Sequence, residues 1–204
     1  MSKKANFFWA SYADLMTSLF FIMLVLFVLT VVMLKRQARA TEEELKKIQE
    51  IENSVANLPD KYFEYQPEFK RHSLREQIQF DKQKSDIPAE YNAYLTNVGN
   101  SIVELINRLN LKYKDENIKY MVVIEGMASK DSYPYNFELS YQRAMALYRF
   151  WLQHNIRFDS NVCEIQIAGS GTGGVGRYSK SGEEYKNQQI LIQIIPKIGR
   201  MQKK

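Results

Sequence analysis

The feature that most constrains this chain is a long apolar stretch near its amino terminus. From Phe7 to Leu34 only Ser, Thr, Tyr and a single Asp interrupt the apolar residues, and residues 19–29 contain no polar side chain. A helix needs about 20 such residues to cross the hydrocarbon core of a bilayer, so we expect a transmembrane helix over residues 12–34. A cleaved signal peptide, with a processing site at residues 38–40, is the alternative, but its apolar region would span only about 7–15 residues.

Charge neither orients this helix nor points to nucleic acid. Lysine and arginine lie on both sides of the apolar stretch, so the positive-inside rule gives no orientation. The 204 residues carry a net charge of +5, but the basic residues are interleaved with Asp and Glu along the chain, which is typical of solvated surface. We therefore expect no nucleic-acid partner. Cys163 is the single cysteine, so no intramolecular disulfide forms, and we expect a small core residue there.

Asp14 is the most informative residue of the apolar stretch. A carboxylate inside a membrane helix costs a few kcal/mol, so it is rare and functional by default. Ser11, Thr17 and Ser18 stand three or four positions from Asp14, which places all four on one helical face. A solvated Asp14 at the membrane interface is the alternative that spacing alone leaves open.

The motif around Asp14 resembles a known family. Residues 9–17 (WASYADLMT) are similar to the signature that opens the transmembrane helix of MotB-type stator subunits. This resemblance implies that Asp14 carries a transported H⁺ or Na⁺, with Ser11, Thr17 and Ser18 as a supporting polar face and no other cofactor. It also implies a single-pass inner-membrane protein with residues 1–11 as a short cytoplasmic tail and a periplasmic C-terminal domain. The implied partners are a second copy of the chain and a MotA-like multi-pass ring subunit, five of them around two of these chains.

An amphipathic segment follows the apolar stretch. Thr41 with Glu44 matches a capping box, and apolar residues then recur at spacings of three and four until Pro59, so we expect a separate helix over residues 41–58. A dimer-forming stalk and, from the stator resemblance, a plug that blocks ion leak are both open interpretations. Residues 59–75 mix aromatic, charged and proline residues without a period, and we expect a linker there.

The remaining chain alternates helical and strand patterns, which predicts an α/β (α+β sandwich) domain over residues 76–197, followed by a basic tail at 198–204. The helical periods fall at residues 89–109 and 137–153. Strand patterns fall at residues 77–80, 120–125, 162–168 and 189–195, the last stopped by Pro196.

This domain also resembles a family. Residues 124–126 (IEG) and 135–144 (YNFELSYQRA) are similar to the OmpA-like peptidoglycan-binding module, whose pattern is Gly-His-Thr-Asp, a gap, then Asn, Leu-Ser and Arg-Ala. The residues that this resemblance places at a peptidoglycan site are Ser129, Asp131, Tyr135, Asn136, Leu139 and Arg143. The family's Asp, which binds the amine of the peptide stem, aligns with Ser129. Asp131 could replace it, while loss of the ligand is the alternative.

Signals for an enzyme are weak. The glycines at residues 169–174 satisfy G-x-G-x-x-G after an expected strand, but loop-forming residues follow where a dinucleotide site needs a helix. His72 and His154 stand in no metal-binding cluster, so we expect neither a metal site nor catalysis.

Two uses of such a motor remain open, flagellar rotation and the B subunit of the Zorya anti-phage system. Only eight residues precede Trp9, and the expected linker is short. These features, with Ser129 in the wall motif, favour the anti-phage use. A passive tether between membrane and cell wall, without an ion path, is the third alternative, which Asp14 argues against.

Overall fold

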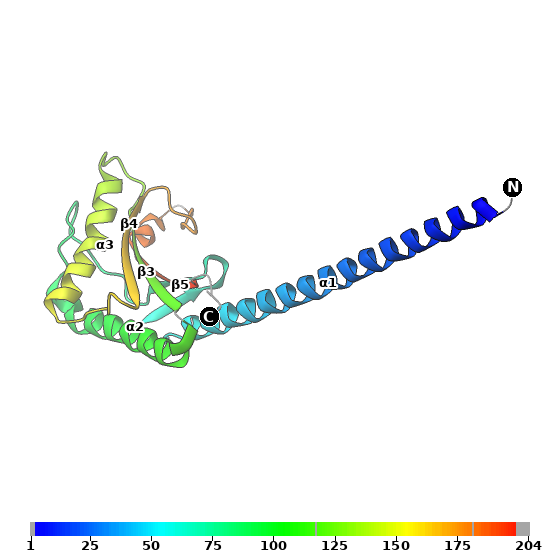
Figure 1. The fold of residues 1–204 in the computed structure, drawn as a ribbon. Coiled ribbons are helices and arrows are strands. Elements are labelled where there is room, and N and C mark those ends of the chain that lie inside the picture. Colours follow the sequence, from blue (N-terminus) through cyan, green and yellow to red (C-terminus); the bar gives the residue numbers. More distant parts are fainter. Residues whose placement is uncertain (1–2, 117, 181, 199–204) are drawn as a thin grey trace. The chain divides into compact units, whose positions relative to one another are not determined.

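The computed structural model describes residues 3–116, 118–180 and 182–198, and the chain divides into two compact units between Gln49 and Glu50. The helices are α1 (Lys3–Ala56), α2 (Asn92–Lys112) and α3 (Asn136–Gln153), with 3-10 helices η1 (Pro67–Phe69), η2 (Ala89–Tyr91), η3 (Lys114–Glu116) and η4 (Glu184–Asn187). The strands are β1 (Phe63–Gln66), β2 (Arg71–Leu74), β3 (Ile118–Met127), β4 (Cys163–Gly171) and β5 (Ile190–Ile198). The expected fold class, an apolar N-terminal helix followed by an α/β domain, is confirmed (Figure 1).

Helix α1 joins the apolar stretch and the amphipathic segment into one element. The sequence contains neither glycine nor proline from Lys3 to Ala56, and the helix ends just before Pro59. The helix start expected at Thr41 is therefore wrong. The Thr41 hydroxyl does not cap a helix, because it donates to the Gln37 carbonyl one turn earlier (3.1 Å).

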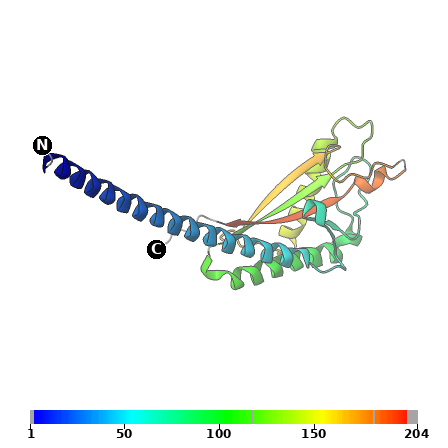
Figure 2. The ribbon, with the colours of Figure 1, turned by 90° about the vertical axis from the view of Figure 1, so that its right-hand side faces the viewer.

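The second unit is built on a five-stranded sheet in the order β1-β2-β5-β3-β4. Strands β3 and β4 are parallel and are connected through α3, which packs on both, while the other pairs are antiparallel. Because side chains alternate across a strand, one face of β3 is buried against the helices. That face carries Ile118, Tyr120, Val122 and Ile124. Figure 2 shows the sheet with α2 alongside the end of α1.

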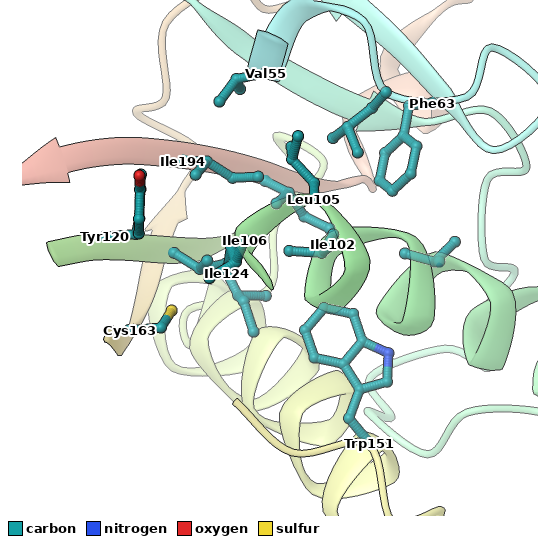
Figure 3. Close-up of a cluster of buried hydrophobic side chains, with 14 of the residues drawn as sticks. Val55, Phe63, Ile102, Leu105, Ile106, Tyr120, Ile124, Trp151, Cys163 and Ile194 are labelled. Atoms are coloured by element: carbon teal, nitrogen blue, oxygen red, sulfur yellow. The ribbon is translucent and has the colours of Figure 1, made fainter. Parts of the chain in front are cut away.

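The core of this unit includes the last turns of α1. Figure 3 shows Val55 of α1 and Phe63 of β1 on one side of α2, and Trp151 of α3 on its other side. Ile51, like Trp151, is fully buried. The indole nitrogen of Trp151 donates to the Leu95 carbonyl (3.0 Å), so this large side chain leaves no polar atom unsatisfied. The end of α1 is thus part of the domain's hydrophobic core.

The linker expected at residues 59–75 is a β-hairpin instead. Strands β1 and β2 pair from Phe63↔Leu74 to Gln66↔Arg71, and β2 adds to the edge of β5 through His72 and Ser73. Pro67 opens the 3-10 turn between the strands, and Lys70 closes it in the left-handed region with φ 48°. Two aromatic residues of this segment, Phe63 and Tyr65, therefore belong to the sheet, and Phe63 is buried in the core.

Two strand predictions also need correction. Residues 77–80 form no regular element, although the Ile78 side chain is buried. Strand β5 does not stop at Pro196. The Met127 amide donates to the Gln189 carbonyl, so alternate residues of β5 bond to β3, and Pro196, opposite Tyr120, turns its nitrogen away from that strand. Proline is tolerated there because no described strand pairs with that edge of β5 beyond Ile192.

Candidate functional site

The first candidate site is the polar face near the start of α1. Residues 11–34 are all exposed, and α1 is the one described helix long and apolar enough to cross a membrane, by length and composition. Apolar surface of this extent needs lipid or a protein partner around it. Together with the α/β domain, this helix fits a single-pass membrane protein.

The Asp14 side chain is exposed on this helix. The Thr17 hydroxyl donates to the Ala13 carbonyl (2.8 Å), so its proton is engaged by the helix backbone. Trp9 and Tyr12 meet edge to face one turn earlier, with ring centroids 6.3 Å apart. No described residue forms an ion pair or hydrogen bond with the Asp14 carboxylate, which leaves it available to an ion or to a second protein.

The second candidate site is a pocket of about 230 Å³ at the start of α3. Of the six residues expected at a peptidoglycan site, the pocket gathers five, Ser129, Asp131, Asn136, Leu139 and Arg143. Tyr135 does not line this pocket. Its side chain is exposed and meets the Tyr133 ring edge to face, with centroids 5.7 Å apart.

Arg143 provides the positive charge of this pocket. Its side chain is almost completely buried on α3, its Nε donates to the Lys84 carbonyl (3.1 Å), and its guanidinium lies over the Phe80 ring, 4.6 Å from the centroid. Burial lowers the pKa of Arg143, and the Asp131 carboxylate opposes this shift. Arginine nevertheless stays protonated in proteins, so a fixed cation faces the pocket.

Asp131 provides the negative charge. One of its carboxylate oxygens accepts from the Tyr133 amide (2.9 Å) and from the Asn136 side-chain amide (2.8 Å). The hydrogen bond from Asn136 is the main cause that lowers the pKa of Asp131, so this carboxyl is ionised at neutral pH. The pocket therefore presents a carboxylate and a guanidinium together, which suits a ligand that carries both an ammonium and a carboxylate group.

Ser129, which the sequence pattern aligns with an aspartate, is engaged by an amide. Gln188 donates from its side chain to the Ser129 hydroxyl (2.6 Å), and Gln77 in turn donates to the Gln188 carbonyl (2.9 Å). This side of the pocket is polar but uncharged. The negative charge of the pocket is carried by Asp131 and not by the residue at position 129.

Several residues that hold the pocket were not expected from the sequence. Arg177 donates to the Ala128 carbonyl (3.0 Å) and pairs with Glu184 (2.6 Å), while Glu184 also accepts from the Lys130 amide. That backbone bond is the main cause that lowers the pKa of Glu184. The pair fixes the backbone on both sides of Ser129. The high glycine content of the loop before Arg177 marks an unusual segment, but it does not indicate that Arg177 and Glu184 support the pocket.

The described part of the same loop does not open the helix that a dinucleotide site needs. It follows β4, as expected, but leads into bends and η4, and Gly171 and Gly174 pack closely on neighbouring side chains. A Cβ on Gly171, whose φ is +52°, would meet the Phe137 ring at 2.6 Å. Among the described residues, no group of His, Cys, Asp and Glu is placed to hold a metal ion.

Fold and pocket together define an α/β ligand-binding domain carried on an apolar helix. The sequence model of the OmpA family matches residues 79–189, more than half of the chain, and the chain belongs to that family. A comparison with curated proteins gives no match.

Solved structures of similar fold include domains from several bacteria. The peptidoglycan-associated lipoprotein from Burkholderia pseudomallei is 13% identical, covering 60% of this chain and 91% of that one, with a TM-score of 0.39. An outer membrane protein from Borrelia burgdorferi is 20% identical over 65% and 95%, with a TM-score of 0.39. The C-terminal domain of Helicobacter pylori MotB is 12% identical over 61% and 86%, with a TM-score of 0.40. The family assignment rests on the sequence match and not on these similarities.

Proposed function

We propose that this chain is the stator subunit of an ion-driven rotary membrane motor, anchored to peptidoglycan by its C-terminal domain. The observation that carries the proposal is Asp14, a carboxylate on the polar face of a helix whose residues 11–34 are all exposed and mostly apolar. The motif at residues 9–17, similar to that of MotB-type subunits, supports the ion-carrying role. The OmpA-family domain that follows on the same chain supplies the anchor.

The mechanism follows from the cost of a buried charge. Two copies of α1 stand side by side within a ring of MotA-like subunits, and each Asp14 alternately takes up and releases a proton, or binds Na⁺. Neutralising the carboxylate changes which surface the helix packs against, so ion flow drives rotation of the ring. The N-terminus is cytoplasmic and the α/β domain periplasmic, in the inner membrane.

The anchor uses the two charges of the pocket at α3. Arg143 binds a carboxylate of the peptide stem, and Asp131 takes the ammonium group that the family's aspartate takes at the position of Ser129. Charge-assisted hydrogen bonds of this kind are about twice as strong as neutral ones. A fixed domain is needed because a helix pair that is free to turn could not rotate the ring around it.

We propose an anti-phage system of the Zorya type as the setting, because the wall motif departs from the usual one at Ser129. Flagellar rotation is the alternative, and the genes beside this one distinguish the two. A passive tether is less well supported, because it gives Asp14 no role on an apolar helix.

The test is proton flux. The chain and its ring partner, co-purified into proteoliposomes, should conduct protons or Na⁺, and Asp14→Asn should abolish the flux while insertion and complex formation persist, since Asn cannot exchange a proton. Ser18→Ala should be much milder, and Thr30→Ala, in the apolar part of α1, should conduct like the wild type. Full flux through the Asp14→Asn complex would show that Asp14 is not the ion carrier.

A further inference from the structure

A groove of about 820 Å³ follows the outer face of α3 and is separate from the pocket at Arg143. One wall is α3 itself, from Tyr141 to Gln153, and the other is the segment from Ser85 to Asn92. At 1.5 Å per residue the helical wall is about 18 Å long, or more than three turns. The groove therefore suits an extended ligand better than a compact one.

The chemistry of the groove is an apolar floor with polar side chains around it. Met145, Ala146 and Phe150 form part of the floor. Gln142 and Arg149 lie on the exposed side of α3, and neither side chain has a hydrogen-bond partner within the described chain. Sugars present the complementary surface, since their C–H faces pack on apolar side chains while their hydroxyl and acetamido groups bond to amides and guanidinium groups.

One short chain segment, which contains Lys84 and Ser85, separates the groove from the Arg143 pocket. The Lys84 carbonyl accepts from Arg143 on the pocket side, and the next residue, Ser85, lines the groove. On α3 the neighbours Gln142 and Arg143 face the groove and the pocket respectively. A ligand held by its carboxylate at Arg143 has only this segment to cross before it enters the groove.

We propose that this groove binds the glycan strand of peptidoglycan while the pocket at Arg143 binds its peptide stem. This inference rests on the proposed wall-binding function, because the stem is covalently attached to the acetamido sugars and brings them to this side of α3. The short segment between the two hollows and the unpaired Gln142 and Arg149 side chains carry it. A helix of a protein partner fits less well, since polar side chains line both walls of the groove.

The test uses the full chain in detergent and a labelled, neutral β-1,4-linked oligomer of N-acetylglucosamine, which carries neither peptide nor carboxylate. We expect measurable binding, weakened about tenfold by Arg149→Ala because one charge-assisted hydrogen bond is lost. Gln142→Ala should weaken it less. Arg108→Ala removes an exposed arginine from α2 and is the matched control, expected to bind like the wild type.

Binding of the sugar oligomer and binding of a stem peptide test the groove and the pocket independently. Arg143→Ala should keep the affinity for the oligomer and lose that for a soluble stem peptide, which tests the pocket alone. No binding of the oligomer to the wild type, or equal binding by the Arg149→Ala and Arg108→Ala variants, overturns the glycan groove, and a protein partner then becomes the better occupant.

Discussion

In the proposed anchor, the residue at position 129 should affect how tightly the pocket holds a peptide stem. Ser129 is buried, and its hydroxyl accepts a hydrogen bond from the Gln188 side chain. A carboxylate at this position could accept the same hydrogen bond. We expect Ser129→Asp to strengthen binding of the full chain to purified peptidoglycan. Arg143→Ala should remove binding, because a charge-assisted contact contributes about 1.5–3 kcal/mol, or roughly tenfold to a hundredfold in affinity.

A pelleting assay with purified peptidoglycan measures both changes. Arg108→Ala again serves as the control, since it removes one positive charge from α2 without touching the pocket. If the wild type does not pellet and Ser129→Asp does not restore binding, the anchor proposal fails and the pocket takes another ligand.

We expect His72 to make the stability of the domain depend on pH. Its ring is buried between Phe63 and Tyr65, and neither nitrogen has a hydrogen-bond partner among the described residues. Burial lowers the pKa of His72 to about 4, and the nearby Ala56 carbonyl opposes the shift only in part. Between pH 6.5 and about 4, His72 is therefore protonated in the unfolded chain but neutral in the folded state.

It follows that the free energy of unfolding is highest above pH 6.5 and falls as the pH drops towards 4, by on the order of 3 kcal/mol from this group. Denaturant unfolding at several pH values should show a flatter profile for His72→Phe than for the wild type. His154→Gln changes the exposed histidine and should keep the wild-type slope. Equal slopes for wild type and His72→Phe would show that His72 is not the responsible group.

The charged residues of the pocket could be predicted from the sequence, but the groups that hold them in place could not. Asn136, Leu139 and Arg143 share one face of a helix with a clear period, so their proximity was predictable. The Lys84 carbonyl that orients Arg143 lies 59 residues away in a loop. No local pattern encodes such a contact, because a backbone carbonyl carries no residue-specific signal.

At the scale of elements, helix α1 limits the plug interpretation. Ile51 and Val55 are buried in the domain core, so the last turns of α1 cannot leave their place without breaking that core. Any plug must lie in the part of α1 that precedes Glu50. Leu45 is exposed there, at 59%, and is free to contact another protein.

Deletion of residues 42–48 tests this plug. The deletion removes about two helical turns, so the helical face is kept while the candidate plug is shortened. Co-expressed with the ring partner, the deletion variant should leak ions, acidify the cytoplasm and slow growth. The leak should vanish when Asp14→Asn is added. Normal growth and unchanged intracellular pH would favour a simple stalk.

The elements that the sequence did not predict are those with short or mixed patterns. The helical periods at residues 89–109 and 137–153 predict α2 (Asn92–Lys112) and α3 (Asn136–Gln153), because the apolar period repeats over several turns. Strands β1 and β2 have four residues each, too few to show alternation against the surrounding charges. Pro196 predicts the end of a strand, but β5 continues through it because no described strand pairs with that edge of β5 beyond Ile192.

At the scale of the whole molecule, the boundary of the wall-binding domain lies earlier than the sequence pattern indicated. The domain expected at residue 76 would lack β1, β2 and the end of α1, although these supply part of one continuous core. The core residues lost are Ile51, Val55, Leu58, Phe63 and Leu74. Truncating a single buried aliphatic residue to alanine already costs about 2–5 kcal/mol, which is a large fraction of a domain's stability.

A fragment of residues 50–204 should therefore be soluble and unfold cooperatively, whereas a fragment of residues 76–204 should aggregate or lack a cooperative transition. The shorter fragment also exposes the edge of β5 that β2 covers at Leu191 and Ile192, which leaves an unpaired strand open to other chains. Thermal unfolding and size-exclusion chromatography of both fragments make the comparison. Ile51→Ala in the longer fragment should lower its melting temperature, because it opens a cavity without exposing a strand. If the 76–204 fragment proved as stable as the longer one, the hairpin and the end of α1 would be accessory to the domain.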